Sequence, residues 1–498
     1  MGTCYSELPG PCPSAHRRIM IELTTQDIRL AGRLLPVPFC LAGRSGTGRC
    51  RITIEKVLRI LPGKRLVARA TTEDGVNILI KLYLGRSAKR YALREVRGTT
   101  LIHNASIPTP RLLWQGETDT NTGNLLAFEF LEDAVSLQTD WQHTMSRSDH
   151  LEILREAMSM LAQMHARGVI QRDIHLGNFL RAGNQLYMID GGHVEPHRNG
   201  PLSSGDSIAN LAEFFAQFFP RYDSLIPLVF PEYLKARSRQ ARESELARLD
   251  SALSRCREVR KRGYLRKTLR DCTQFECETT FRRFLVCVRD SLNRDMMELL
   301  DHPDYWMDRG EALKRGGSAT IVRVQLGHHD LVVKRYNLKG PLHRLKRALG
   351  PSRARRSWVN AWRMEFLGIP SVKPIAMIEE KLGPFRGRAY FVSEYVAGRD
   401  ALATIKTSHQ PDDQMAAISS LLQDLSDSRI SHGDMKATNF MMSATGPVIM
   451  DLDAMREHRD AISFRRAFRR DLKRFMENWR DRPELANQFR GLLADLDA

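Results

Sequence analysis

The sequence predicts an α+β protein with two tandem units of one bilobal architecture, each with a β-rich N-lobe and a helical C-lobe. The first observation is a pattern of Asp, Asn and Asp that occurs twice with the same two spacings. Its members are Asp173, Asn178 and Asp190 in the first copy and Asp434, Asn439 and Asp451 in the second. The second observation is that stretches with the alternation of β-strands precede each copy. Two spacings repeated in register favour duplication over coincidence.

Length and composition allow this organisation. The chain has 498 residues, of which 42% are hydrophobic, so it can bury more than one core. No apolar run approaches the twenty or so residues of a membrane span; the longest such run, LLPVPFCLAG, contains two prolines. The N-terminus lacks the apolar core of a secretory signal. We therefore expect a cytoplasmic protein, with residues 1–19 either unstructured or preceding the true start at Met20.

The net charge of +18 indicates an anionic partner, which could be nucleic acid, a phosphorylated glycan or an acidic membrane face. Residues 331–364 contain ten Lys or Arg and no acidic residue, which also fits a solvated basic helix. Nucleic acid is the poorest of these partners, because no basic patch is interleaved with stacking aromatic residues. The eight cysteines form no C-x-x-C pair and are expected to be reduced thiols.

The first N-lobe is predicted from three alternating stretches separated by turns at Pro62-Gly63 and Asp74-Gly75. These stretches cover residues 51–60, 64–71 and 76–84. Lys81 lies in the third, where a kinase-like fold places the lysine that binds ATP phosphates. Glu95 lies in the following helical segment and would hold that lysine in position. Residues 1–45 show no clear periodicity and are interpreted as an extension.

The first C-lobe is predicted from a buried strand at 125–133 and a helix with one apolar face that leads to Asp173. Gln171 stands where protein kinases have a histidine, so we expect a scaffold hydrogen bond to be lost there. Asp206 begins an amphipathic helix, where it would either cap the helix or brace the catalytic loop. The predicted domains are the first unit at 46–240, a helical linker at 241–300 and the second unit at 301–498.

The second N-lobe is predicted from two strands joined by a small, flexible turn, whose backbone N–H groups could approach phosphate oxygens. The turn contains Gly316, Gly317 and Ser318. Lys334 in the next strand is the counterpart of Lys81. The Ile-Pro pairs of the two units are 262 residues apart and the Asp-x-x-x-x-Asn loops 261. This alignment places Ser357 opposite Glu95, so the second unit has no helix glutamate to hold its lysine.

These residue types indicate phosphoryl transfer from ATP, which needs a carboxylate to deprotonate a hydroxyl and further oxygen ligands for magnesium. Asp434 and Asp173 are the candidate bases. Asn439, Asp451, Asn178 and Asp190 are the candidate Mg²⁺ ligands. Lys436 lies two residues after Asp434, where some kinases use a lysine to neutralise the transferring phosphate. Asp471 is interpreted as the counterpart of Asp206.

Five segments together resemble the bacterial lipopolysaccharide kinase family: LKRGGSATIVRV, LVVKRYN, SRARRSW, HGDMKATNF and MDLDAM. The resemblance covers about residues 310–480, and the first unit shares only the Lys, Glu, Asp, Asn and Asp set. It implies a protein-kinase-like fold, MgATP as phosphate donor, and a sugar hydroxyl of the lipopolysaccharide inner core as acceptor. On matching positions it makes Asp434 the base and Lys334 the phosphate lysine, with Asp173 and Lys81 their equivalents.

The resemblance also gives the basic stretch a specific role. Lipopolysaccharide core and lipid A are anionic, so we expect residues 339–356 to contact the glycolipid or the cytoplasmic leaflet. The charges expected to matter are Arg344, Lys346, Arg347, Arg353, Arg355 and Arg356. Two alternatives stay open: a kinase for a protein or small-molecule acceptor, and a partly inactive kinase-like regulator or scaffold. The sequence does not specify the sugar, the hydroxyl or the oligomeric state.

Overall fold

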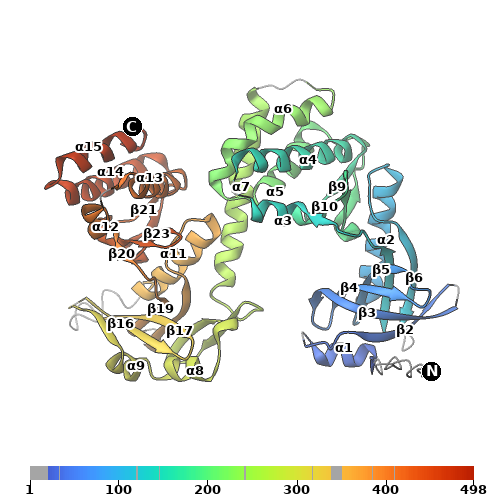
Figure 1. Cartoon of the computed structure of the whole chain (residues 1–498), viewed down its shortest axis with the longest axis horizontal. Helices are drawn as coiled ribbons and strands as arrows, with labels where there is room; N and C mark the ends of the chain where they lie inside the picture. Colours follow the sequence, from blue (N-terminus) through green and yellow to red (C-terminus); the bar gives the residue numbers. More distant parts are fainter. Residues whose placement is uncertain are drawn as a thin grey trace, which may run out of the picture. The chain divides into compact units, whose positions relative to one another are not determined.

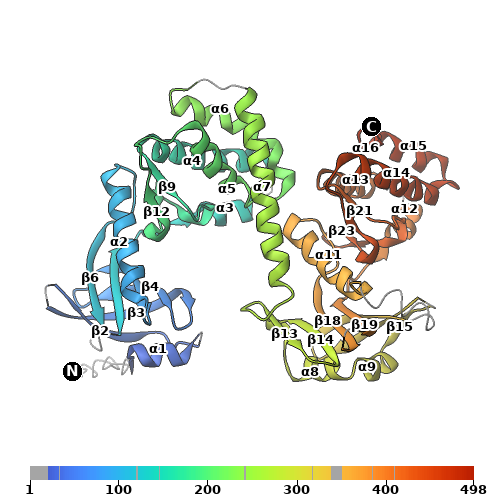
Figure 2. The ribbon, with the colours of Figure 1, turned by 180° about the vertical axis from the view of Figure 1, so that it is seen from behind.

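The computed structural model describes residues 21–32, 34–46, 48–118, 122–144, 146–239, 243–316, 318–337, 350–383, 385–408 and 410–497. The chain forms two compact units. The first consists of Met1–Phe214 and Leu225–Asp250, and the second of Phe215–Ser224 and Ser251–Ala498. Figures 1 and 2 show their elements from opposite sides. Helix α7 (Glu243–Lys267) carries the chain from the first unit into the second.

The first unit contains a seven-stranded sheet in the order β1-β2-β3-β4-β5-β7-β6, with a further pairing between β2 and β6. The strands are β1 (Ile21–Glu22), β2 (Phe39–Ser45), β3 (Gly48–Leu61), β4 (Arg65–Thr72), β5 (Asn77–Leu84), β6 (Leu112–Thr118) and β7 (Gly123–Glu129). The turns lie at Gly63 and Gly75, both with the positive φ that glycine tolerates. Strands β3 to β5 therefore lie where their alternation predicted them.

Strand β2 corrects the interpretation of residues 1–45 as an extension. Phe39 and Leu41 are buried in the core of the first sheet, and β2 pairs with both β3 and β6. Helix α1 (Thr25–Ala31) precedes it and buries Ile28 in the same core. The seven-residue strand FCLAGRS was too short for its pattern to be recognised, and its conformation is decided by distant pairing partners such as Gly43 with Thr118. Residues 1–20 lie outside the described residues.

The helical part of the first unit follows α2 (Ala88–Asn104), which packs against the sheet. Its elements are β8 (Val135–Ser136), α3 (Leu137–His143), α4 (Arg147–Ala166), β9 (Val169–Gln171), η1 (Leu176–Asn178), β10 (Phe179–Ala182), β11 (Gln185–Met188), η2 (Gly191–His193), β12 (Val194–Pro196), α5 (Ser204–Phe215) and α6 (Ile226–Ala236). Leu154, Met158 and Leu161 form the buried face of α4, as their helical spacing predicted.

The second unit has an antiparallel sheet in the order β13-β14-β18-β19-β17-β16-β15. Its strands are β13 (Phe275–Thr279), β14 (Arg283–Val288), β15 (Glu311–Arg315), β16 (Ala319–Leu326), β17 (His329–Tyr336), β18 (Pro374–Leu382) and β19 (Phe385–Glu394). Strands β13 and β14 occupy part of the predicted helical linker at 241–300. That linker is helical through α7, but the hairpin after it joins the second sheet through pairing of β14 with β18.

The remaining elements of the second unit include those on either side of the loop that carries Asp434. They are α8 (Arg294–Asp301), α9 (Pro303–Arg309), α11 (Arg353–Leu367), β20 (Arg399–Asp400), α12 (Ala401–Thr407), α13 (Asp412–Asp427), β21 (Ile430–Ser431), η5 (Ala437–Asn439), β22 (Phe440–Ser443), β23 (Gly446–Ile449), η6 (Leu452–Ala454), β24 (Arg456–Glu457), α14 (Ala461–Met476), η7 (Glu477–Trp479), α15 (Pro483–Leu492) and α16 (Ala494–Asp497). One core joins α11 to α13 and α14, with Trp358 and Phe475 fully buried in it. This core fixes α11 against the segments on either side of the loop.

Candidate active site

The loop between β21 and η5 presents Asp434 with two cationic neighbours. The Asp434 carboxylate forms ion pairs with Arg474 Nε at 2.7 Å and with Lys436 Nζ at 3.4 Å. Asn439 Nδ2 donates to the backbone carbonyl of Asp434 at 2.8 Å, so the asparagine five residues on closes the loop. The side chain of Asp434 is 33% exposed. A hydroxyl group arriving from solvent can therefore reach the carboxylate.

Lys334 on β17 reaches the second predicted aspartate of this unit. Its Nζ lies 2.6 Å from Asp451 Oδ1, and Asp451 has a left-handed backbone with φ 53°. Burial by itself would raise the pKa of Asp451, but the Lys334 ammonium holds that pKa below its ordinary value. Ser357 stands where the first unit has Glu95, and its Oγ lies 2.7 Å from the Tyr336 hydroxyl. The lysine thus pairs with Asp451 instead of a helix glutamate.

The predicted phosphate turn is anchored at both of its described ends. Asn337 Nδ2 donates to the carbonyl of Gly316 at 3.1 Å, and Asn337 N–H donates to the carbonyl of Ser318 at 3.2 Å. Gly317 lies outside the described residues. The turn joins β15 to β16 next to β17, so the structure brings Gly316 and Ser318 onto the sheet that carries Lys334.

The first unit holds its lysine differently. Lys81 forms a buried ion pair with Glu95, as the sequence predicted, and Glu95 also accepts hydrogen bonds from Gly191 N–H at 3.1 Å and Tyr83 O–H at 3.2 Å. Lys81 Nζ is 3.9 Å from Asp190 Oδ1. The relative exposures of Lys81 and Glu95 are 8% and 1%. The pair is therefore shielded from water and fixes α2 against the sheet and against the segment after Asp190.

These groups line a cavity of about 590 Å³ in the first unit. Its walls include Lys81, Glu95, Asn178 and Asp190 together with the apolar side chains of Val67, Leu79, Phe128 and Ile189. Apolar walls beside a few convergent charges are typical of nucleotide-sized ligand pockets. Asp190 Oδ1 is buried and accepts no hydrogen bond from a described residue. This oxygen lies 3.9 Å from both Lys81 Nζ and Arg65 Nη1, and a carboxylate oxygen without a hydrogen bond fits a Mg²⁺ ligand, since Mg²⁺ prefers oxygen donors.

The loop of the first unit repeats the closure seen in the second. Asn178 Nδ2 donates to the backbone carbonyl of Asp173 at 2.8 Å, and Asp173 is exposed. The structure thus brings together the predicted Lys, Asp and Asn groups within each unit.

Comparison with known families decides the identity of the second unit. Residues 304–489 match the family model described as the Lipopolysaccharide kinase (Kdo/WaaP) family. These residues belong to the lipopolysaccharide kinase family. The family predicted from the sequence motifs is confirmed for this span, and the chain is an ATP-dependent kinase with an alcohol group as acceptor. No curated protein matches the sequence.

Solved structures similar to this chain include kinases. WaaP in complex with acyl carrier protein is 21% identical, with 42% of this chain and 88% of that chain covered and a TM-score of 0.31. The Toxoplasma gondii specific rhoptry antigen kinase domain is 12% identical. The match covers 48% of this chain and 94% of that chain, with a TM-score of 0.32. Vaccinia related kinase 3 is 11% identical. The match covers 46% of this chain and 87% of that chain, with a TM-score of 0.28.

Gln171 corrects one sequence-based expectation about this kinase. In the second unit, His432 Nδ1 accepts from Asp434 N–H at 3.4 Å and His432 Nε2 lies 3.0 Å from the Met450 carbonyl. In the first unit, Gln171 Oε1 accepts from Asp173 N–H at 3.3 Å and Gln171 Nε2 donates to the Asp190 carbonyl at 2.9 Å. The expected loss of a scaffold hydrogen bond is therefore wrong, because a glutamine amide supplies both an acceptor and a donor.

Asp206 was the wrong candidate for the loop brace in the first unit. Asp471 accepts from His432 N–H at 2.7 Å, 39 residues earlier in the chain. The same separation joins Asn210 Nδ2 to the Gln171 carbonyl at 3.0 Å. Asp206 is instead exposed and accepts from Ser203 Oγ at 2.5 Å at the start of α5. Counting 39 residues on from Gln171, as from His432 to Asp471, would have identified Asn210. Asp206 was chosen because it is an acidic residue at the start of a helix.

His165 gives the first unit a pH-dependent stability. Its ring nitrogens bond the Tyr233 hydroxyl at 2.8 Å and Asn210 Oδ1 at 3.0 Å, and burial lowers the pKa of His165 to about 4. In the unfolded chain a histidine takes up a proton near pH 6.5, whereas in the folded chain His165 stays neutral down to about pH 4. The stability gained from the neutral, buried imidazole is therefore fully present above pH 6.5 and is lost as the pH falls. We expect about 3 kcal/mol to be lost as pH falls from 6.5 to 4.

Urea unfolding of the first-unit transition at several pH values measures this dependence. The His165→Gln variant should be less stable at pH 7 but should lose less of its stability between pH 6.5 and pH 4. An equal slope in both proteins would show that other groups dominate the acid sensitivity.

The basic stretch expected to contact glycolipid is only partly described. Arg344, Lys346 and Arg347 lie outside the described residues. Arg353 pairs with Asp453, and Arg355 NH2 lies 2.9 Å from Glu379 Oε2, so both cations are neutralised within the second unit. No described helix is long and apolar enough to cross a bilayer. Of the six cysteines that the structure describes, none forms a disulfide with another described residue.

Proposed function

We propose that this kinase transfers the γ-phosphoryl group of ATP to a sugar hydroxyl of the lipopolysaccharide inner core, and that the second unit performs the transfer. The observation that carries the proposal is a pair of ionic clusters within the span that matches the family: Asp434 with Lys436 and Arg474, and Lys334 with Asp451. Met450 N–H donates to the Asn439 carbonyl at 2.8 Å, which holds the segments of the two clusters together. A carboxylate between two cations can orient a hydroxyl while the cations offset charge on the transferring phosphoryl group.

The roles follow from the positions of these side chains. Asp434 accepts the proton of the sugar hydroxyl as its oxygen bonds to the γ-phosphorus and the bond to the ADP oxygen breaks. Lys334 binds the phosphates of ATP, and Lys436 neutralises negative charge on the phosphoryl group during its transfer. Asn439 and Asp451 would hold Mg²⁺, which supplies charge neutralisation when bound. Gly316, Gly317 and Ser318 are proposed to cover the phosphates.

The first unit is proposed to be a second kinase-like domain in tandem. Its buried Lys81–Glu95 pair, the nearby Asp190 and the 590 Å³ cavity support nucleotide binding. Asn178 and Asp190 would hold Mg²⁺ there, with Asp173 as the equivalent of Asp434. Whether this unit also turns over is decided by the Asp173 variant described in the Discussion.

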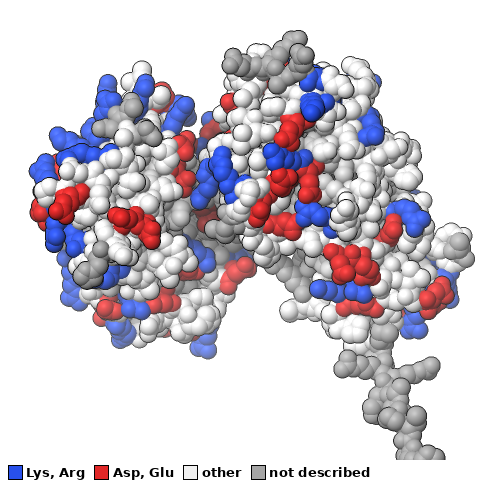
Figure 3. Space-filling model, turned by 45° about the horizontal axis from the view of Figure 1, so that its top comes forward, with Lys and Arg blue, Asp and Glu red and all other residues white. Residues whose placement is uncertain are grey.

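The anionic acceptor has a basic surface next to Asp434. Helix α14 exposes Arg465, Arg466, Arg469, Arg470 and Lys473, and none of the five forms an ion pair with a described residue. The next residue, Arg474, contacts Asp434. Lys and Arg gather on the margin of the body that contains α14, drawn at the left of Figure 3. We propose that this helix, rather than Arg353 and Arg355, draws the glycolipid or the anionic membrane face toward the active site.

Neutralising this helix should weaken membrane binding strongly. Each cation near an acidic surface contributes about 1 kcal/mol, so the Gln variant at Arg465, Arg466, Arg469 and Arg470 should bind anionic vesicles at least about 100-fold more weakly. Vesicle sedimentation with phosphatidylglycerol liposomes measures the change. A control variant with Gln at the exposed, unpaired Arg29, Lys56, Lys89 and Arg94 of the first unit should bind normally. Equal losses in the two variants would mean that only net charge matters.

Transfer of radiolabelled phosphate tests the function itself. Purified full-length protein with labelled ATP should phosphorylate deacylated core oligosaccharide, and mass spectrometry of the product should locate one added phosphate on a sugar. Label found only on protein or on another small molecule would instead support a kinase for a different acceptor. Absence of transfer to any acceptor, with nucleotide still bound, would support a kinase-like regulator.

A further inference from the structure

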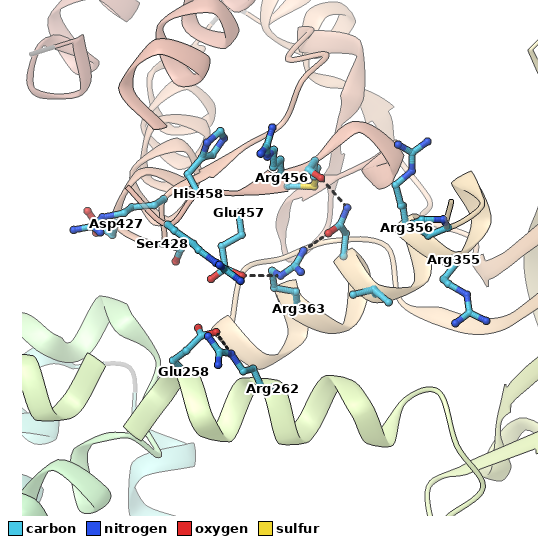
Figure 4. Close-up of a pocket in the computed structure, with 16 residues that line it drawn as sticks. Glu258, Arg262, Arg355, Arg356, Arg363, Asp427, Ser428, Arg456, Glu457 and His458 are labelled. Atoms are coloured by element: carbon cyan, nitrogen blue, oxygen red, sulfur yellow. Dashed lines mark hydrogen bonds and ion pairs between the residues drawn. The ribbon is translucent and has the colours of Figure 1, made fainter. Parts of the chain in front are cut away.

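A cavity of about 720 Å³ in the second unit does not contain the catalytic residues. It is bounded by α7, α11, the turn after α13 and the segment around β24, as Figure 4 shows. Seven arginines line it against three carboxylates. This excess of positive charge in a concave site distinguishes it from a solvated basic helix, because converging guanidinium groups repel one another unless an anion separates them.

Two of the three carboxylates of the cavity already form ion pairs. Glu258 bonds Arg262 at 2.6 Å, and Glu457 pairs with Lys261 and lies 3.2 Å from Arg363 Nε. The third, Asp427, accepts from Gln423 at 2.7 Å. Gln423 is neutral, so Asp427 keeps its charge, and this one carboxylate stands against the remaining arginines.

Four arginines remain available to a ligand. Arg356 comes from α11, Arg429 from the turn after α13, and Arg456 and Arg459 from β24 and the residues after it. All four are exposed, and none forms an ion pair with a described residue. Deeper in the cavity, burial lowers the pKa of Arg363, and Glu457 only partly offsets this effect. An anion among these side chains would therefore gain several charge-assisted hydrogen bonds and relieve a buried cation.

The first unit provides an internal comparison for this cavity. With the 261- or 262-residue offset, the positions of Arg429 and Arg456 are taken by Gly168 and Glu195, whereas Arg356 and Arg459 correspond to Arg94 and Arg198. Glu195 there pairs with Arg172 at 3.2 Å, so the charge at that position is reversed and neutralised. Arg429 and Arg456 are thus specific to the second unit, and the complete set of three arginines proposed below is absent from the first.

The walls of the cavity are connected to the active site through the backbone. Asn360 Nδ2 on α11 donates to the carbonyls of Leu452 at 2.7 Å and Met455 at 3.1 Å, directly after Asp451. Strand β24 pairs with β21, which leads into the loop that carries Asp434. A ligand held by Arg356 and Arg456 would bridge the same two elements that Asn360 joins.

We propose that this cavity binds a phosphate-bearing anion through Arg356, Arg429 and Arg456, at a site separate from the catalytic loop. Guanidinium groups match phosphate oxygens in a bidentate manner, and the volume accommodates a phosphorylated sugar as well as a simple anion. The phosphate could belong to the glycolipid or to a free phosphorylated compound. Binding at this site does not depend on the acceptor proposed above.

Calorimetric titration of the full chain tests the proposal, with both units saturated by a non-hydrolysable ATP analogue to fill the nucleotide sites. Three compounds are titrated separately: inorganic pyrophosphate, deacylated phosphorylated lipopolysaccharide oligosaccharide, and the same oligosaccharide after removal of its phosphates. The variant with Gln at Arg356, Arg429 and Arg456 should bind the phosphorylated compounds at least tenfold more weakly than the wild type. Gln at Lys56, Lys89 and Arg94 is the matched control, since Arg94 is the first-unit counterpart of Arg356.

The outcomes separate the sources and can overturn the proposal. Weakening seen with pyrophosphate alone identifies a free phosphorylated ligand, and weakening seen with the phosphorylated oligosaccharide identifies the glycolipid. Lys at the same three positions should restore part of the affinity, and the single Arg456→Gln variant guards against loss of folding. Equal affinity of the wild type and the Gln variants for all three compounds, or no binding by the wild type, would refute the site. The Asp434→Asn variant should still bind the phosphorylated compounds with the wild-type affinity. This result would show that binding in the cavity is independent of catalysis.

Discussion

The Asp434→Asn variant is expected to transfer phosphate to core oligosaccharide about 1000-fold more slowly than the wild type, because an amide cannot accept the proton of the hydroxyl. The substitution preserves the shape of the side chain and removes only the charge that pairs with Arg474 and Lys436. Nucleotide affinity should change little, since Lys334 and Asp451 remain in place. Initial rates with radiolabelled ATP, together with binding of a fluorescent ATP analogue, measure the two effects separately.

The Asp173→Asn variant is the matched control in the first unit. It makes the same change at the equivalent position, and we expect core phosphorylation to continue at nearly the wild-type rate. If Asp173→Asn abolishes transfer while Asp434→Asn does not, the first unit is the catalyst. If neither variant alters the rate, the enzymatic roles assigned to both loops are wrong.

The Lys81→Met variant is expected to destabilise the first unit by about 3–5 kcal/mol, because it leaves the buried Glu95 carboxylate without its cation. Glu95 is 1% exposed, so water cannot replace the lysine. The hydrogen bonds from Gly191 and Tyr83 remain but do not compensate a full charge. Calorimetric unfolding of the full chain should show the first-unit transition at a lower temperature, with the second-unit transition unchanged.

Two further variants test the cause. The double variant Lys81→Met with Glu95→Gln removes the unpaired charge and should recover part of the lost stability. Lys334→Met should cost the second unit less, because the Asp451 side chain is 34% exposed and water can solvate it. Similar losses for Lys81→Met and Lys334→Met would contradict the assignment of burial as the deciding factor.

The features that could be predicted from the sequence are those with a local cause. Asn178 and Asn439 each bond the carbonyl of the aspartate five residues earlier, so the spacing itself encodes the loop closure. Strand alternation and turn glycines place Lys81 on β5 without knowledge of the rest of the chain. The family motifs are likewise short segments, and the match over 304–489 confirmed the family that they predicted. The catalytic and metal-binding roles of these residues stay predictions.

The features that the sequence did not reveal depend on partners far apart in the chain. Strands β2, β13 and β14 are fixed by their neighbours in the sheets, so local composition described them as an extension and a helical linker.

Within the site, residues of different types occupy corresponding positions of the two loops, and only the structure shows what each of them contacts. Gln171 and His432 each accept from the N–H of the loop aspartate, but Gln171 donates to the Asp190 carbonyl whereas His432 contacts the Met450 carbonyl. Asn210 donates to the Gln171 carbonyl, whereas its counterpart Asp471 accepts from His432 N–H. Amide side chains carry both a donor and an acceptor, so they can hold the loop through different backbone groups.

The sequence by itself determined the repeated loops, the lysine strands and the family of the second unit, because each depends on residues that are close together in the chain. Only the tertiary structure decided which cations are free. It neutralised Arg353 and Arg355 with distant carboxylates and left the arginines of α14 exposed. It also gathered Arg356, Arg429 and Arg456 from three elements around one cavity. The physical reason is that the pairing of a charge depends on which groups lie within a few ångströms of it, and folding brings those groups from anywhere in the chain.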